Sequence, residues 1–252
     1  MIRFVAICFF FMLLSVLAGE GTVFAGSWQV LPIRVDLSAK VKTEVVTIIN
    51  NGDEPLFLEM RTLQWLQDGA GKDTYTETED LVFFPKKLSI PPREERIVRL
   101  GIRAPQTVKE RTYRLFIREI PEPKSAAEGT GVAIAIEFGV PIFVKPFQEN
   151  LAGAITSSVL REEQAQCTIS NTGNVHFRIN NINFSAKNAN NETIFSQEVN
   201  GWYLLAGTAR TFSTLIPAEL CPNLATIDIQ AKANQLTLNG KIDVDPASCP
   251  TR

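Results

Sequence analysis

The chain has little of the residue types on which enzyme active sites depend. Of its 252 residues only one is a histidine, His176, and it stands in a strand-like stretch where a lone histidine is usually structural. No serine lies in a nucleophile-elbow motif, and there is no glycine-rich phosphate loop. The four cysteines have neither a zinc-binding spacing nor a Cys-x-x-Cys pair. We therefore expect no enzymatic activity, no cofactor, no metal ion and no small-molecule substrate.

The chain also lacks a strong charge of either sign. Its 25 basic and 27 acidic residues give a formal net charge of −2, and no basic run argues for a nucleic-acid partner. The only long apolar run, residues 5–17, follows Arg3 at the N-terminus, and Val23-Phe24-Ala25 then places small residues where a signal peptidase reads them. We expect residues 1–25 to be a secretory signal peptide that is cleaved after Ala25.

The rest of the chain shows strand signals throughout and no stretch with a helical period. Short runs rich in β-branched and aromatic residues alternate with turn signals, a pattern typical of β-sandwiches. The expected strands cover residues 28–37, 41–50, 55–65, 81–90, 96–102, 112–120 and 131–144, and then 153–159, 166–171, 175–184, 193–202, 208–215, 226–231 and 238–244. A polar stretch that begins at Lys145-Pro146 separates the two sets. We predict an all-β fold of two immunoglobulin-like β-sandwich domains, residues 26–146 and 147–252.

Cleavage of the signal peptide removes Cys8 and leaves an odd number of cysteines. In an oxidising compartment two of the three should form a disulfide. The last two expected strands form a hairpin that turns near Asn234, which places Cys221 and Cys249 opposite each other. We predict a disulfide between Cys221 and Cys249, with Cys167–Cys221 as the alternative pairing.

One expected strand near the end of the first domain has an unusual distribution of side-chain sizes. Its alternate residues Val132, Ile134, Ile136 and Phe138 are bulky and apolar, and the residues between them are small or charged. Successive side chains of a strand point to opposite faces. If the small face lies against the protein's own core, the bulky row is free to pair with a partner. An ordinary half-buried strand with its bulky row inward is the alternative.

Three charged residues of the first half also stand out. Arg34 lies in an apolar strand, where its guanidinium would hold a carboxylate through paired hydrogen bonds. It is expected on the face opposite a common apolar face made of Leu31, Ile33, Val35 and Leu37. A surface arginine or an internal ion pair is the alternative. Arg99 and Glu110 flank a short connection between two strands, which predicts a salt bridge between them.

The chain resembles the periplasmic pilus-assembly chaperones of the chaperone–usher pathway over nearly the whole mature sequence. The pieces that carry the resemblance occur in the family's order and spacing. They are Ile33-Arg34-Val35, Val46-Thr47-Ile48-Ile49-Asn50-Asn51, Ile90-Pro91-Pro92, Ile97-Val98-Arg99-Leu100, Arg118-Glu119-Ile120-Pro121, Val140-Pro141-Ile142-Phe143-Val144-Lys145-Pro146 and Ile169-Ser170-Asn171-Thr172-Gly173-Asn174. The resemblance implies two domains set at an angle with a cleft between them. The family's lysine is missing from the expected strand at residues 112–120, which favours a divergent, archaic-like branch.

The resemblance also implies how the chain would act. Chaperones of this family lend the last long strand of their first domain to an incomplete pilus or fimbrial subunit, which is donor-strand complementation, and deliver the subunit to an outer-membrane usher. The lent residues would be Val132, Ile134, Ile136 and Phe138. A second copy of the chaperone is a further candidate to cover this strand, as a self-capping dimer.

In chaperones of this family, two basic residues bind the C-terminal carboxylate of the subunit. The first falls on Arg34. The second is expected on the strand at residues 112–120, which here contains Arg114 and Arg118 but no lysine. The chain departs from the family pattern here, so either the carboxylate anchor is weaker or another base, such as Arg114 or Arg103, replaces the lysine.

By the same resemblance Arg99 and Glu110 form an interdomain ion pair. The acidic partner that the second domain would add is not evident, because Asn234 lies near the expected place.

The alternative function is a secreted structural or adhesive β-sandwich protein. A pilus subunit would be an incomplete fold, however, and this chain has enough expected strands for two complete sandwiches.

Overall fold

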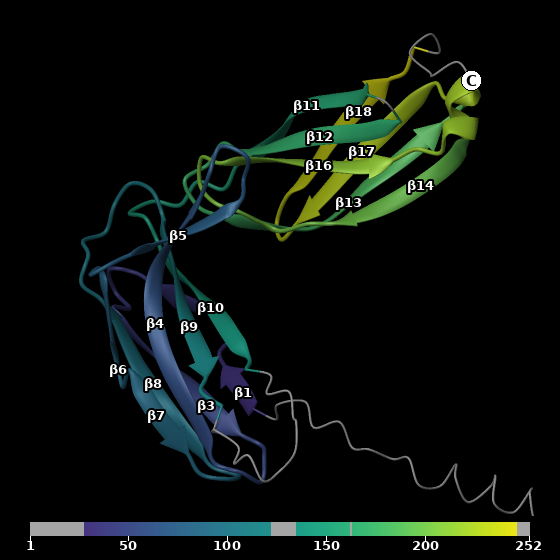
Figure 1. Cartoon of the computed structure of the whole chain (residues 1–252). Coiled ribbons are helices and arrows are strands. Elements are labelled where there is room, and N and C mark those ends of the chain that lie inside the picture. Colours follow the sequence, from purple (N-terminus) through teal and green to yellow (C-terminus); the bar gives the residue numbers. More distant parts are fainter. Residues whose placement is uncertain (1–27, 122–134, 162, 246–252) are drawn as a thin grey trace, which may run out of the picture.

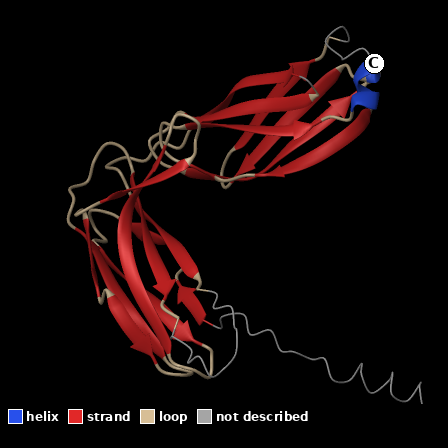
Figure 2. Ribbon diagram, viewed as in Figure 1, coloured by secondary structure: helices blue, strands red, loops and turns tan. Residues whose placement is uncertain are grey.

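The structure is a computed structural model that describes residues 28–121, 135–161 and 163–245. It contains two β-sandwiches, one from each half of the chain, which meet at an angle (Figure 1). The only helix in these ranges is the short 3-10 helix η2, Ala218–Asn223 (Figure 2), and none is long and apolar enough to cross a membrane. The predicted fold class is confirmed. The boundary at residue 146 stays a prediction, and the predicted signal peptide lies outside the described residues.

The first sandwich consists of a four-stranded sheet, in the order β1-β3-β8-β6, and a larger sheet in the order β2-β10-β9-β4-β5, with β7 also paired to β4. Neighbouring strands are antiparallel except β2 and β10, which are parallel. The strands are β1 (Trp28–Leu31), β2 (Val35–Leu37), β3 (Thr43–Asn50), β4 (Leu56–Gln67), β5 (Asp73–Glu77), β6 (Leu81–Phe84), β7 (Lys87–Ile90), β8 (Glu95–Ile102), β9 (Arg111–Glu119) and β10 (Glu137–Val144).

The second sandwich has a three-stranded sheet, β11-β12-β16, and a larger sheet in the order β14-β13-β17-β18, with β15 also paired to β13. The strands are β11 (Gly153–Arg161), β12 (Gln164–Asn171), β13 (Phe177–Lys187), β14 (Thr193–Asn200), β15 (Tyr203–Leu204), β16 (Ala209–Leu215), β17 (Thr226–Ala233) and β18 (Thr237–Asp243). Each sandwich buries its own apolar core, and the two cores share no residue.

The first predicted strand is in fact two strands that belong to different sheets. β1 buries its even-numbered residues and β2 its odd-numbered residues, Val35 and Leu37. Pro32 lies between them, and proline has no N–H for a ladder. The predicted common apolar face is therefore wrong for Leu31 and Ile33, which are 50% and 78% exposed. The chain changes sheets in the same way between β6 and β7.

The cysteine-containing end of the second sandwich matches part of the prediction. β17 and β18 form the expected antiparallel hairpin, with Asn234 in its turn. Cys167 is a buried free thiol in the second core, which argues against the alternative Cys167–Cys221 pairing. Cys221 is buried in η2, just before β17, but Cys249 lies outside the described residues. The Cys221–Cys249 disulfide stays a prediction.

A long hairpin connects the first sandwich with the second. β4 and β5 extend beyond the rest of their sheet toward the second sandwich (Figure 1). Near the base of the extension, Trp65 of β4 and Phe143 of β10 pack with Leu205 into a third apolar cluster. All three side chains are less than 5% exposed, so the two halves share a buried contact as well as a covalent connection.

Candidate functional site

Strand β10 has a neighbour on only one side along its first half. It pairs with β9 over its full length, whereas β2 pairs only with Ile142, Phe143 and Val144. Over residues 137–141 the edge that faces away from β9 has no strand beside it in the described part of the chain. Backbone groups on such an edge are a template for a strand of another protein.

The predicted donor residues are only partly within the described ranges. Val132 and Ile134 lie outside them. Ile136 is partly buried against the first core, and Phe138 of β10 is 40% exposed. The Phe138 ring meets Trp28 edge to face, with the ring centroids 4.6 Å apart. Phe138 is thus a large apolar side chain at the open edge that its own domain covers only in part.

We predicted that the face of this strand with the small side chains lies against the core. This prediction is wrong for the residues of the strand that the structure describes. Glu137 is exposed and its carboxylate lies 3.4 Å from Arg61. Gly139 lies beside the side chains of Phe116 and Arg114. Ile136 instead packs against the core, because the face that continues the buried positions Val140 and Ile142 carries the even-numbered residues.

Arg34, the predicted carboxylate anchor, lies between β1 and β2 at the end of the sheet nearest the second sandwich. Its Nε donates to both carboxylate oxygens of Asp36, at 3.1 and 2.9 Å, and its Nη2 donates at 2.6 Å. The guanidinium also lies over the ring of Phe143, 4.8 Å from the centroid. Burial lowers the pKa of Arg34, but the hydrogen bonds and charge of Asp36 outweigh it, so the net pKa is raised.

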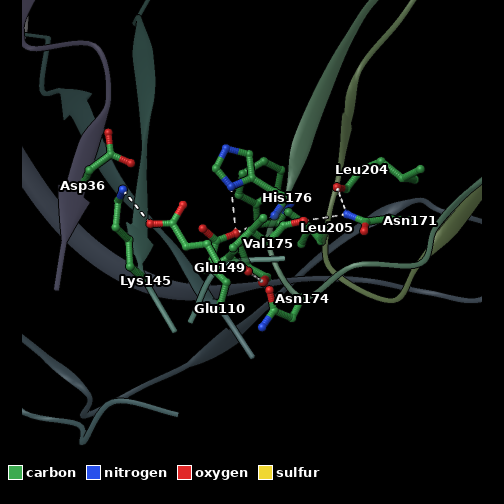
Figure 3. Close-up of polar contacts among 12 residues, drawn as sticks. Asp36, Glu110, Lys145, Glu149, Asn171, Asn174, Val175, His176, Leu204 and Leu205 are labelled. Carbon is green, nitrogen blue, oxygen red and sulfur yellow. Dashed lines mark hydrogen bonds and ion pairs between the residues drawn. The ribbon is translucent and has the colours of Figure 1, made fainter. Parts of the chain in front are cut away.

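Lys145, directly after β10, brings a second base to the same place. Its Nζ lies 2.8 Å from Glu149 (Figure 3), and this hydrogen bond is the main reason why the pKa of Lys145 is raised. The charges of Asp36 and Arg34 also act on Lys145, in opposite directions. We refer to Arg34, Asp36, Lys145 and Glu149 as the charged cluster.

Arg114, a candidate for the second anchor, packs among aromatic rings at the junction of the two sandwiches. Its guanidinium lies 4.1 Å from the ring centroid of Trp65, and the rings of Tyr75 and Trp202 lie at 5.7 Å. Its Nη2 is 3.7 Å from Asp73, and only 13% of its side chain is exposed. A cation enclosed by aromatic rings stabilises the contact between the sandwiches and offers little surface to a carboxylate.

The other two candidate bases, Arg103 and Arg118, are exposed. Arg118 has Glu59 at 3.9 Å, and Arg103 forms no ion pair with any described residue. Neither is drawn into the charged cluster.

The predicted ion pair between Arg99 and Glu110 is not formed. Arg99 is exposed on the outer face of the four-stranded sheet, where it lines a pocket of about 370 Å³ with Val45, Val82 and Phe84. It makes no ion pair with any residue in the described ranges, because Arg99 and Glu110 belong to different surfaces of the sandwich.

Glu110 does cross to the second sandwich, but its partner is His176. One carboxylate oxygen accepts from the His176 backbone N–H at 2.8 Å and lies 2.7 Å from Nδ1 (Figure 3). The two side chains are only 3% and 6% exposed. The imidazole stacks on Phe143, with the ring centroids 3.5 Å apart and the planes 9° from parallel. The lone histidine is structural, as expected.

Gln67, at the end of β4, is the second polar centre of the junction. Its Oε1 accepts from the Leu205 backbone N–H at 3.0 Å and from the Thr208 hydroxyl at 2.8 Å. Its Nε2 donates to the Tyr203 carbonyl at 2.9 Å and to Asp73 at 3.0 Å. The side-chain amide thus uses donors and acceptors together to join the hairpin to the second sandwich.

The geometry defines a class of protein: two linked β-sandwiches with a half-open strand in the first and a charged cluster beside the junction. Residues 27–149 match the family model for pili and flagellar-assembly chaperones, PapD N-terminal domain. The N-terminal sandwich therefore belongs to the pili and flagellar-assembly chaperone family.

Solved structures of pilus chaperones share the fold over most of the chain. One is a chain of the CsuC–CsuE chaperone–tip adhesion subunit complex from the archaic chaperone–usher Csu pili of Acinetobacter baumannii. It is 18% identical with a TM-score of 0.58, over 84% of this chain and 97% of that one. The YadV chaperone is 12% identical with a TM-score of 0.57, over 86% of this chain and 100% of that one. A chain of the Salmonella enterica SafA pilin–SafB chaperone complex is 10% identical with a TM-score of 0.55, over 87% of this chain and 98% of that one. No curated protein sequence matches the chain.

Several of these site residues were not found by sequence reasoning. Asp36 follows Arg34 by two positions, which puts both on one face of the predicted strand at residues 28–37 and is a signal that could have been used. Lys145, His176 and Gln67 gave no such signal, because their partners come from distant parts of the chain. Among the described residues, no group of three or more His, Cys, Asp or Glu side chains is placed to hold a metal ion.

Proposed function

We propose that the chain binds pilus subunits in the periplasm by donor-strand complementation, with β10 and the residues before it as the lent strand. The observation that carries the proposal is the open edge of β10 over residues 137–141. A subunit strand placed there would complete hydrogen bonds that β2 is too short to supply. Phe138 at this edge and Ile136 next to it, which their own domain covers only in part, would turn their uncovered sides into the subunit, together with Val132 and Ile134.

The anchor we propose for the C-terminal carboxylate of the subunit is Arg34, with Lys145 as the second base. Arg34 already holds one carboxylate with two of its nitrogens, so its position suits paired hydrogen bonds. Lys145 shares the electrostatic environment of Arg34 and is 42% exposed, whereas Arg114 is enclosed by aromatic rings. The anchor would fix one end of the subunit while β10 pairs with its strand.

Further steps of the proposal follow from the family. After cleavage near Ala25 the mature chain would deliver its subunit to an outer-membrane usher, and a second copy would cap the lent strand when no subunit is bound. The likeness to the CsuC–CsuE structure, and a strand β9 without lysine, favour an archaic-like branch. The Cys221–Cys249 disulfide would form in the same oxidising compartment.

The test is recovery of a subunit with variants of the lent strand. The chaperone would be co-expressed with a small secreted β-protein encoded beside its gene, and the complex purified from the periplasm through a tag on the chaperone. Placing a charge in an apolar groove removes the gain from burying Phe138 and adds a desolvation cost, so Phe138→Asp should lower subunit recovery by roughly tenfold or more.

Leu215→Asp is the matched control, because Leu215 is 68% exposed but lies on β16 of the second sandwich. It should recover the subunit at the wild-type level. Thermal unfolding of both variants shows whether each is folded. A folded Phe138→Asp chaperone that recovers as much subunit as the Leu215→Asp control would refute the proposed role of this edge.

A further inference from the structure

The charged cluster is neutral as a whole, because each base has an acid of the same chain beside it. Arg34 is paired with Asp36 at 2.6 Å, and Lys145 with Glu149 at 2.8 Å. The four side chains are between 37% and 50% exposed, so solvent and a bound polypeptide both have access to them. An incoming carboxylate would therefore meet two bases whose charge is already compensated.

The Arg34–Asp36 pair is held more firmly than an ordinary surface ion pair. Asp36 lies on β2, and its register partner on β10 is Phe143, which carries the Arg34 guanidinium over its ring. Phe143 is fully buried and stacks on His176, whose partner Glu110 is also buried. The ring below Arg34 is thus fixed from both sandwiches, and the guanidinium has little freedom to move away from Asp36.

Asp36 uses one edge of the guanidinium, formed by Nε and Nη2. The Nη1 group of Arg34 has no hydrogen-bond partner among the described residues. An external carboxylate has two routes to Arg34: it displaces Asp36 from the first edge, or it binds the remaining edge close to the negative charge of Asp36. Both routes weaken its binding, the first by competition and the second by repulsion between like charges.

We propose that Asp36 is an internal competitor that lowers the affinity of Arg34 for the carboxylate of a bound polypeptide. The inference rests on the proposed function only in taking that carboxylate to belong to a pilus subunit. Its consequence is an anchor that orients a subunit without holding it so tightly that release becomes slow. Glu149 acts in the same way on Lys145, at a more exposed pair.

The competition is measured directly with acetate, the simplest carboxylate probe, on the mature full-length chain. The NMR resonance of the Arg34 Nε–H group, assigned by its loss in Arg34→Ala, is followed while acetate replaces chloride at constant ionic strength. Partly exposed ion pairs contribute at most a small free energy, so Asp36→Asn should lower the half-saturating acetate concentration by roughly two- to fivefold.

Asp53→Asn is the matched control, because Asp53 accepts from Nε and Nη2 of Arg93 at 3.0 and 2.7 Å on another part of the surface. It should leave the response of Arg34 unchanged. The proposal is overturned if Asp36→Asn and the wild type respond to acetate alike, or if Asp53→Asn changes the response of Arg34 as much as Asp36→Asn does.

A second arm separates this inference from the proposed function. With the co-purified subunit, Asp36→Asn should slow dissociation by roughly two- to fivefold, and the Arg34→Ala/Asp36→Asn double variant should lose that gain. If acetate shows the competition but neither Arg34→Ala nor Asp36→Asn changes subunit dissociation, Asp36 does mask Arg34, and it is the anchoring role of Arg34 that fails.

Discussion

The sharpest prediction about the junction of the two sandwiches concerns Glu110. Replacing it with alanine removes the one acceptor that serves both the backbone N–H and the ring Nδ1 of His176. An ionised carboxylate oxygen only accepts, so a hydrogen bond between an ionised Glu110 and the ring uses the His176 tautomer with its proton on Nδ1. Because His176 is packed on Phe143, neither donor can turn toward solvent when the acceptor is gone.

The magnitude follows from burial. Leaving one buried hydrogen-bond donor without an acceptor costs about 1–3 kcal/mol, so the two donors that lose Glu110 together cost about 2–6 kcal/mol. For a chain of this length each kcal/mol lowers Tm by about 2–4 °C, so Glu110→Ala should lower Tm by roughly 4–24 °C. Glu110→Gln keeps one acceptor and should lose less.

Thermal unfolding followed by circular dichroism or calorimetry measures the effect. Glu149→Ala is the control, because it removes an exposed ion pair worth at most about 1 kcal/mol and should lower Tm by at most about 4 °C. Equal Tm values for Glu110→Ala and Glu149→Ala would refute the reasoning, since they would mean that the contact with His176 adds nothing to stability.

Two further predictions concern the hairpin and the cysteines. Gly71 at the hairpin tip has φ +74°, and a Cβ there would lie 2.6 Å from the Ala209 carbonyl oxygen. Gly71→Ala should therefore lower the free energy of unfolding by roughly 1–3 kcal/mol, measured by denaturant unfolding. An unchanged unfolding midpoint would contradict this close contact. Burial raises the pKa of Cys167 to about 12, so at pH 8 its thiol stays protonated and iodoacetamide should not label the native protein. Unfolding without a reductant should expose one labelled cysteine, Cys167, and reduction should add Cys221 and Cys249; labelling of all three before reduction would exclude the predicted disulfide.

The sequence predicted most strands because alternation of apolar residues is a local property. It failed where the chain changes sheets, at Pro32 and between β6 and β7, because the buried side is then set by the sheet that receives the strand. Strand β5 was missed altogether, since its residues 73–77 are mostly polar and its partners lie on β4 and in the second sandwich.

Only part of the candidate site was predicted, because its residues come from distant parts of the chain. Arg34 stood out as a base within an apolar strand, but its neighbours Lys145 and Phe143 come from the far end of the first domain. The expected Arg99–Glu110 pair was wrong because proximity along strands says little about which surface each side chain reaches. The proposed lent strand stands out in the sequence by its alternating bulky residues, yet the direction in which they point depends on how β10 continues into the core.

The amide of Gln67 has one more consequence, for the medium in which the chaperone works. Three of its four hydrogen bonds, with Tyr203, Leu205 and Thr208, tie the hairpin to the second sandwich through a side chain that carries no net charge, and the fourth goes to Asp73 within the hairpin. Dissolved ions screen exposed charges over about 10 Å at 0.1 M, but they have little effect on a neutral hydrogen bond. These three contacts between the sandwiches should therefore depend little on ionic strength, whereas the exposed charged cluster should depend on it more.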